Sequence, residues 1–467
     1  MTTAGLTAGQ DYEFVNGFPT PETVQRAYDD ADLIRAITAY RFFFPSVSAC
    51  MIYDGNIEAG MVANQIIAVV RDAVGLRCFT PNSDTPYGGL MLDVSDGPMV
   101  IELPAGALMG TVNDLNQRWV LDMGLPGPDR GEGGKHLVLP PGYDGEVPDG
   151  YHTGTPTTNR MIGLLRALPP HGDLEAGVSL METAKVYPLH ARPGWKEPTW
   201  LDLSHEFDFS PLPLENDLGY WQVLHELIDR EPAYDGYRNA YGELAALGIA
   251  KGQPFDPDQR MKAILVRAAQ LANAQMRVQS LADRRPDRGV WDGTHWEWAV
   301  LRPENGTFDA NSYVDVEARE KWFFQAQIES PAMFARVPGA GSLYWLCARD
   351  KSGAYLDGAR SYRLSVPLPV PDKLFWSITV YDALTRAEIV TDQNLAALRS
   401  LVELPADRLG DASTAELYFG PEQPDGAGGR WIKTLPGRGW FVYFRIYGPD
   451  GPAFDGGWRL PDFEPLT

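Results

Sequence analysis

The chain has 467 residues, of which 44% are hydrophobic and 22% are charged, so it is long enough to fold into more than one domain with a sizeable core. Its 62 acidic residues outnumber its 40 lysines and arginines, which gives a formal net charge of −22. A negative field of this size repels nucleic acids and anionic membranes, so neither is expected as a partner. We expect a small molecule as substrate or ligand, and the sequence leaves assembly into a homo-oligomer open.

The N-terminal residues and the cysteines give two further predictions, on location and on disulfides or zinc. The first ten residues contain no basic segment followed by an apolar one, and no run of eighteen apolar residues occurs, so we expect a cytoplasmic protein. Cys50, Cys78 and Cys347 are widely separated and odd in number, which predicts neither a disulfide framework nor a zinc site. We interpret them as small buried residues.

Hydrophobic spacing in the first half of the chain predicts helices followed by strands. Helical spacing predicts one helix over residues 21–45, ended by Pro45, and a second over residues 56–73. From residue 80 to about 168, short alternating segments separated by glycine-rich turns predict a β domain. The clearest of its strand segments cover residues 99–103, 108–123 and 135–139.

The second half repeats this order of helix and strand. Residues 171–215 are rich in proline and aromatic residues and predict a linker or covering loop, whereas residues 217–285 show helical spacing. The pattern turns β-like after Trp291, and residues 342–460 are typical of a sandwich or jelly-roll. We therefore predict an α+β fold with two antiparallel β-sandwich or jelly-roll-like domains, an N-terminal helical segment and a central helical insert. The expected boundaries are 1–79, 80–215 with the covering loop, 216–290 and 291–467.

A polar turn lies between Pro81 and Pro86, immediately before a predicted strand. The prolines restrict its backbone, and Asn and Asp side chains can bond to nearby backbone groups, so the turn should be rigid. One interpretation is a turn that satisfies its own polar groups. The other is a functional loop in which Asn82 binds a ligand and Asp84 and Tyr87 act in catalysis.

Two C-terminal segments, 375–382 and 440–447, alternate between an apolar and a polar face. If both polar faces lie on one sheet, they form a surface suited to an oxygen-rich molecule, because arginine binds carboxylates and tyrosine both stacks and donates hydrogen bonds. The alternatives are a domain interface or a half-exposed sheet. The candidates are Tyr381 for catalysis and, for ligand binding, Ser377, Thr379, Tyr443, Arg445, Tyr447 and also Trp376 from the apolar face.

Asp114 and Arg118 form another candidate pair. If residues 111–123 form one strand, both side chains lie on the same face. They are then either a surface ion pair or a catalytic acid/base with an anion-stabilising partner. We list Asp114 as a catalytic candidate and Arg118 as a ligand-binding one.

Common cofactor and metal motifs do not occur. The sequence has no G-x-S-x-G, no phosphate-binding G-x4-G-K-S/T and no HExxH, so no cofactor is predicted. A divalent metal held by Asp84 and Asp114 is an alternative that no ligand motif supports.

The residues of the polar turn and of the C-terminal strands also resemble a known bacterial pattern. Residues 81–87 with Leu92-Asp93, Gly97-Pro98 and Leu103-Pro104 are similar to the signature of domain of unknown function 1254, and Asp114 and Arg166 fall at positions where that family has the same residues. The C-terminal half resembles its usual partner, domain of unknown function 1214, through residues 375–382, 445–447 and Trp458. Pro86 and Arg118 depart from the pattern. The resemblance implies two β-rich domains with helical insertions, and it implies no activity.

Three hypotheses follow from these residues. The first is a cofactor-independent acid/base enzyme, a hydrolase or lyase, that acts on an oxygen-rich or aromatic small molecule. The second is a protein that binds a carbohydrate or another small ligand without catalysis, and the third is a structural or assembly protein. In the first, the base is Asp84 or Asp114, the proton donor Tyr87 or Tyr381, and the anion stabiliser Arg118 or Arg445.

Overall fold

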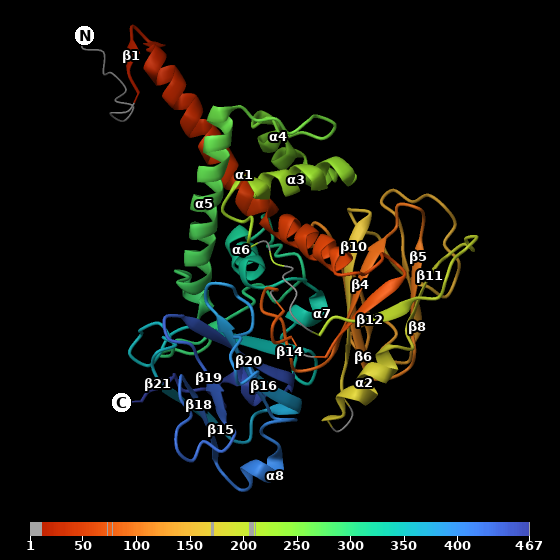
Figure 1. Ribbon diagram of the computed structural model, residues 1–467, viewed down its shortest axis with the longest axis vertical. Coiled ribbons are helices and arrows are strands. Elements are labelled where there is room, and N and C mark those ends of the chain that lie inside the picture. The colour runs from red at the N-terminus through yellow and green to blue at the C-terminus, as the bar shows by residue number, and fades with distance from the viewer. Residues whose placement is uncertain are drawn as a thin grey trace.

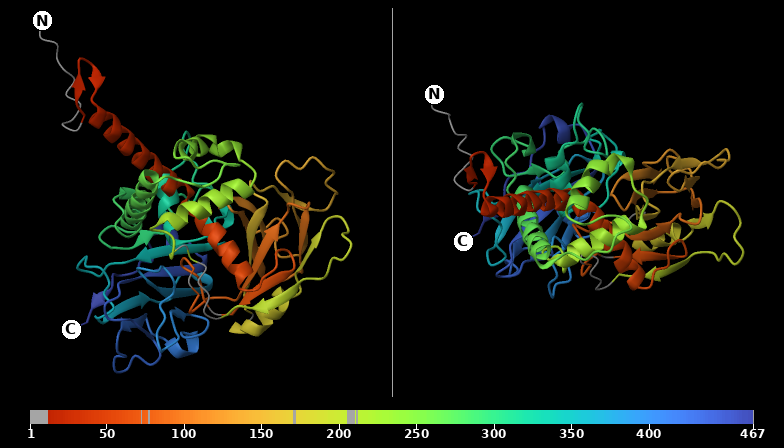
Figure 2. Two further views of the ribbon diagram at one scale, coloured as in Figure 1. Left: turned by 45° about the horizontal axis from the view of Figure 1, so that its top comes forward. Right: turned by 90° about the horizontal axis from the view of Figure 1, so that it is seen from above.

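The computed structural model describes residues 12–71, 73–76, 78–169, 172–204, 210 and 212–466 (Figure 1). Parts of the expected covering loop, 171, 205–209 and 211, lie outside the described residues. Two β-rich domains lie side by side, with a group of helices packed over both (Figures 1 and 2). This arrangement confirms the predicted α+β class with two β domains, an N-terminal helix and a helical insert.

The first helix, α1 (Pro21–Glu58), is longer than predicted. Thr20 caps it by accepting a hydrogen bond from the backbone of Thr23, and Pro21 occupies its first turn. The expected end at Pro45 is wrong: the helix continues through this proline, because its second half is buried against other helices and this packing compensates for the missing backbone hydrogen bond. Its first half projects from the body together with a small hairpin, β1 (Phe14–Val15) and β2 (Phe18–Pro19) (Figure 2).

The second predicted helix, 56–73, is also wrong. Residues 66–70 form strand β3 (Ile66–Val70), in which four of the five residues are β-branched and the middle three are buried. β-Branched side chains pack well in a sheet interior, and a fully buried strand shows no alternation that would distinguish it from a buried helix.

The N-terminal β domain consists of two sheets with a shared apolar core. A six-stranded sheet has the order β12-β3-β4-β10-β6-β7, and a four-stranded sheet has the order β11-β5-β8-β9. Most neighbours are antiparallel; β12 pairs with β3 and β8 with β9 in parallel. The elements are β4 (Tyr87–Asp93), β5 (Met99–Leu103), β6 (Leu108–Asp114), β7 (Trp119–Gly124), β8 (Gly134–Val138), β9 (His152–Gly154), β10 (Arg160–Ala167), α2 (Leu174–Met181), β11 (Lys185–Pro188) and β12 (Thr199–Asp202).

The predicted strand 108–123 is two strands, β6 and β7, joined by a tight turn. Asp114 forms this turn by accepting hydrogen bonds from the backbone N–H groups of Asn116 and Arg118, and Gln117 has a positive φ of 55°. Asp114 and Arg118 therefore lie at the two ends of a turn and not on one strand face, because the Asp side chain replaces strand hydrogen bonds with local ones.

The helices between the two β domains share a core with α1. Tyr40 and Phe44 of α1 pack with Tyr220 and Trp221 of α3 and with Leu265 of α5. These elements are α3 (Leu218–Arg230), η2 (Asp235–Tyr237), α4 (Arg238–Ala246), α5 (Gln259–Leu281) and η3 (Pro286–Arg288), followed by α6 (Val316–Gln325) and α7 (Pro331–Phe334). The last two stand in a region expected to be β-like; Asp315 and Ser330 cap them.

The C-terminal domain is also built from two sheets, with orders β13-β14-β20-β16-β17 and β19-β18-β15-β21. In the first sheet Ser377 pairs with Arg445 and Thr379 with Tyr443, so the two polar faces predicted from sequence do lie on one sheet. The strands are β13 (Glu297–Trp298), β14 (Ser342–Cys347), β15 (Tyr362–Pro367), β16 (Asp372–Asp382), β17 (Ala397–Arg399), β18 (Thr414–Gly420), β19 (Trp431–Lys433), β20 (Trp440–Pro449) and β21 (Glu464–Pro465), with short helices α8 (Ala406–Leu409) and α9 (Pro452–Asp455).

Within the described part of the chain, no helix is long and apolar enough to cross a membrane.

Candidate functional site

A cavity of about 610 Å³ lies between the two β domains. One wall comes from β4, β6, β7 and β10 of the N-terminal domain, and the opposite wall comes from β14 and β20 of the C-terminal domain. The segment from α6 to α7 contributes the remaining side. Its polar lining consists mainly of Thr80, Asn82, Tyr87, Asp122, Arg166, Tyr344, Tyr443, Arg445 and Tyr447.

Arg445 lies at the polar end of this cavity, and its side chain is only 2% exposed. Its two Nη atoms donate hydrogen bonds to Thr379 Oγ1 at 3.0 Å and to the Tyr381 hydroxyl at 2.8 Å, whereas its Nε has no hydrogen-bond partner within the described residues. Its guanidinium also lies 5.1 Å from the ring centre of Tyr443. The strand neighbours thus fix the arginine without neutralising its charge.

Arg166, on β10, is the second cation of the cavity. It donates from Nε to Thr85 Oγ1 at 2.9 Å and from Nη2 to the Tyr447 hydroxyl at 3.3 Å. The guanidinium lies 4.9 Å from the ring centre of Tyr87. Its Nη1 has no hydrogen bond to any described residue. The sequence singled out Arg166 only through the family resemblance, although an arginine directly after the apolar run 161–165 of β10 is itself a signal.

The polar turn of residues 80–87 connects the two domains. Asp84 Oδ2 accepts hydrogen bonds from Ser377 Oγ at 2.7 Å and from the Tyr447 hydroxyl at 2.8 Å. Asn82 accepts from the backbone N–H of Asp84 and donates to the Tyr447 hydroxyl, both at 2.7 Å. Some polar groups of the turn are therefore hydrogen-bonded within the turn, and others are hydrogen-bonded to residues of the C-terminal domain. Asn82 and Tyr87 line the cavity, whereas Asp84 lies behind them.

The tyrosine hydroxyls of the site differ in whether they already donate a hydrogen bond within the protein. Tyr381 donates to the Pro81 carbonyl, Tyr443 to Gln325 Oε1 and Tyr447 to Asp84. Burial raises the pKa of all three, and the Asp84 charge raises that of Tyr447 further. Tyr87 faces the cavity with a hydroxyl that makes no hydrogen bond to a described residue, and burial raises its pKa as well. It is the predicted proton donor that remains accessible, whereas Tyr381 lies behind Arg445.

Asp122 is a cavity carboxyl that sequence analysis did not select. It lies on β7 and is 7% exposed. Burial raises its pKa, and hydrogen bonds with Thr111 and Ser330 partly offset that effect. Tyr344, another missed residue, lines the cavity from β14 and accepts a hydrogen bond from Ser342.

Asp114 and Arg118 do not join this site. Both line a separate cavity of about 380 Å³, where Arg118 lies 5.2 Å from the ring centre of Tyr234. Asp114 also accepts two hydrogen bonds from Thr157, so its oxygens are used structurally, and burial raises its pKa. The structure separates it from Asp84, and the described residues contain no group of three or more His, Cys, Asp or Glu that could hold a metal ion.

Trp376 requires a correction. It was a ligand-binding candidate, but it is 3% exposed and stacks on Phe444 in the core between the two C-terminal sheets. The strand period of two places it on the face opposite to Ser377 and Thr379. These two residues are fully buried themselves and act on the site through Asp84 and Arg445.

Two family models match the chain, one in each β domain. Residues 64–188 match the family model described as protein of unknown function DUF1254, and residues 341–451 match protein of unknown function DUF1214. No curated protein matches the chain. Among solved structures, the VPA0106 protein of Vibrio parahaemolyticus is similar in fold, with a TM-score of 0.57 and 15% identity over 93% of this chain and all of that one. An uncharacterized protein from Burkholderia cenocepacia has a TM-score of 0.39 and 12% identity, and the alignment covers 95% of this chain and 97% of that one.

Proposed function

We propose that this chain, which belongs to the family that joins a DUF1254 domain to a DUF1214 domain, binds a small organic molecule in the cavity between these two domains. The observation that supports the proposal is the cavity itself. Its volume of about 610 Å³ is typical of small-molecule sites, and a few polar groups converge in a lining that is otherwise mostly apolar. A largely apolar lining favours a ligand with an apolar body over a carbohydrate.

A thermal-shift screen of small metabolites tests this proposal, because a ligand that binds the folded state raises the melting temperature. Ala332 lines the cavity, so Ala332→Phe should fill part of it without removing a polar group. Ala359→Phe introduces the same side chain at an exposed position and serves as the control. Cavity ligands should stabilise the wild type and Ala359→Phe but not Ala332→Phe. Equal stabilisation of all three proteins would place the binding elsewhere and contradict the proposal.

Acid/base catalysis by a hydrolase or lyase is the second candidate, and Asp122 favours it. A cavity carboxyl whose pKa is raised by burial holds a proton more readily than a solvated one and is a candidate general acid or base, and the free hydroxyl of Tyr87 lines the same cavity. Each ligand from the screen should therefore be incubated with the protein and followed by NMR. Asp122→Asn should abolish conversion while it preserves the thermal shift. Ligands that bind but are never converted would leave binding without catalysis.

A further inference from the structure

Arg445 and Arg166 place positive charge at one end of the cavity that the described residues do not fully neutralise. We infer that the ligand is an organic acid with a single negative charge, whose carboxylate binds between these two arginines and whose apolar body fills the rest of the cavity. This inference rests on the proposed binding function and specifies its ligand class.

The first argument is a comparison among the buried cations. Among the described residues, four lysines or arginines are at most 5% exposed: Arg160, Lys321, Arg386 and Arg445. The first three each contact a carboxylate directly, at 2.6 Å from Glu231, 2.6 Å from Glu297 and 2.7 Å from Glu215, respectively. For Arg445, no carboxylate oxygen of a described residue lies within 4.0 Å. A buried charge without such a partner is unfavourable, so a ligand that supplies the anion would bind strongly.

The second argument comes from the free hydrogen-bond donors. Nη1 of Arg166 has no partner within the described residues; Nε of Arg445 has none either, but this atom is buried, so Arg445 acts on a ligand mainly through its charge. The aromatic rings of Tyr87, Tyr443 and Tyr447 lie beside the two guanidinium groups and restrict their orientation. A planar carboxylate matches the flat arrangement of guanidinium donors, and the Tyr87 hydroxyl adds one further donor.

The third argument is the charge balance at this end of the cavity. Asp84 is the carboxylate whose charge acts on Arg445, although it lies beyond ion-pair distance and its Oδ2 is occupied by Ser377 and Tyr447. Asp122, the other carboxyl of the cavity, has a pKa raised by burial, which favours its neutral form, so Asp84 against two guanidinium groups leaves one positive charge. A ligand with one negative charge balances it, whereas a phosphate dianion would exceed it.

The remaining lining determines the rest of the molecule. Away from the arginines, the cavity is bounded mainly by apolar side chains of both β domains and of the α6–α7 segment, among them Met109, Leu164, Trp322, Ile328, Met333 and Leu374. Burial of an apolar group against them contributes about 25 cal/mol for each Å² removed from water. The ligand is therefore amphipathic, with its charge at one end.

Isothermal titration with matched acids and amides tests the inference. Benzoate, naphthalene-2-acetate and decanoate are compared with their primary amides, which have nearly the same shape and no charge. At least one acid should bind the wild type at least tenfold more tightly than its amide, and Ala332→Phe should abolish that binding. Arg166→Gln should reduce the affinity for the acid at least tenfold and leave the affinity for the amide within about twofold.

The outcomes separate this inference from the proposed function. Amides that bind as tightly as acids, with binding blocked by Ala332→Phe, would overturn the inference and retain the cavity as the site. If neither acids nor amides bind, and the metabolite screen finds no ligand that Ala332→Phe blocks, both fail. Arg445→Gln should also weaken binding of the acid and leave binding of the amide unchanged. If Arg445→Gln does not fold, Arg166→Gln is sufficient for the test, because Arg166 is less buried.

Discussion

The hydroxyl of Tyr447 donates a hydrogen bond of 2.8 Å to the carboxylate of Asp84, a residue 363 positions earlier in the chain. This contact joins the polar turn of the N-terminal domain to the central strand β20 of the C-terminal one. The same hydroxyl accepts hydrogen bonds from Asn82 and Arg166, so one oxygen connects three cavity-forming segments. The shape of the cavity therefore depends on contacts between the domains.

Tyr447→Phe should destabilise the protein by about 1–3 kcal/mol, because it leaves buried donors and an acceptor without a partner. Urea denaturation measures the change in the free energy of unfolding. Tyr28→Phe is the control, since Tyr28 is 65% exposed and the same change there should cost less than about 0.5 kcal/mol. Equal stability of the two variants would show that the interdomain contact contributes nothing measurable.

The buried pair of Arg386 and Glu215 gives a second prediction. The two side chains are 1% and 2% exposed and 2.7 Å apart, and Arg386 lies between the rings of Phe79 and Phe324, 4.1 Å from each ring centre. Arg386→Met should destabilise by about 3–5 kcal/mol, because the buried Glu215 keeps only the longer contact with Arg277, at 3.9 Å. The double variant with Glu215→Gln should recover part of this loss in urea denaturation.

The matched control for that pair is on the surface. Arg238 and Asp235 are 81% and 93% exposed and lie 3.7 Å apart, so Asp235→Asn should change stability by less than about 1 kcal/mol. If Arg386→Met lowers the free energy of unfolding by no more than Asp235→Asn does, the loss of an ion-pair partner is no more destabilising at a buried position than at the surface of this protein.

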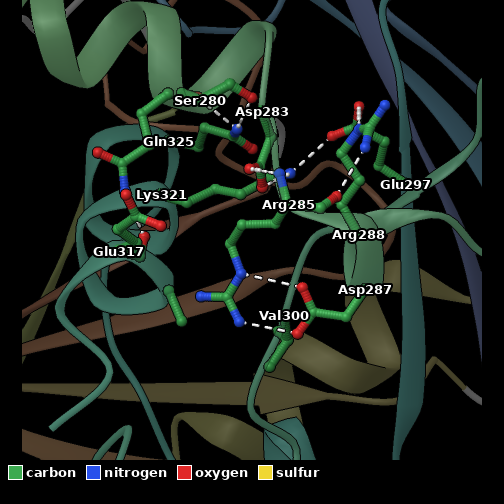
Figure 3. Close-up of polar contacts among 12 residues, drawn as sticks. Ser280, Asp283, Arg285, Asp287, Arg288, Glu297, Val300, Glu317, Lys321 and Gln325 are labelled. Carbon is green, nitrogen blue, oxygen red and sulfur yellow. Dashed lines mark hydrogen bonds and ion pairs between the residues drawn. The ribbon is translucent and has the colours of Figure 1, made fainter.

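Lys321 makes a third case, drawn in Figure 3. Its Nζ is fully buried and lies 2.9 Å from Asp283 and 2.6 Å from Glu297, which places one cation between two acids at the junction of the helical insert and β13. Lys321→Met should destabilise by about 3–5 kcal/mol, measured by urea denaturation, because the buried Asp283 loses its cation, whereas Glu297 keeps Arg288 at 3.2 Å. Adding Asp283→Asn should restore much of the stability; no recovery would mean that the lost lysine packing, and not the unpaired charge, causes the effect.

The sequence predicts features that depend on local periodicity and fails where long-range packing decides. Strand alternation correctly placed Ser377 opposite to Trp376, and pairing with Arg445 followed in the structure. The course of α1 through Pro45 could not be predicted, because burial against helices more than 170 residues away compensates for the proline.

The candidate site shows the same division. Asn82, Tyr87, Arg445 and Tyr447 were selected from local patterns and line one cavity. Asp122 and Tyr344 were missed because only the docking of two domains brings them there, and nothing in their local sequence marks them. Asp114 looked catalytic since an Asp that forms a turn and an Asp that transfers protons have the same sequence pattern.

Asp372 provides the last prediction, a pH dependence. Burial raises the pKa of Asp372 to about 6 from a reference value of 3.8. The folded state therefore holds this proton more tightly than the unfolded state does. The resulting stabilisation is fully present below pH 3.8 and is lost as the pH rises through about 6.

Asp372→Asn removes this dependence, so the variant should gain stability relative to the wild type between pH 4 and pH 7. The shift corresponds to about 3 kcal/mol for a fully buried group, and screening by water at this partly buried side chain reduces the expected gain to about 1 kcal/mol. Urea denaturation of both proteins at four pH values measures it. Val147→Ala, at an exposed position without a titratable side chain, is the control and should show a difference from the wild type that does not change with pH. A constant difference for Asp372→Asn as well would mean that burial does not raise the pKa of Asp372.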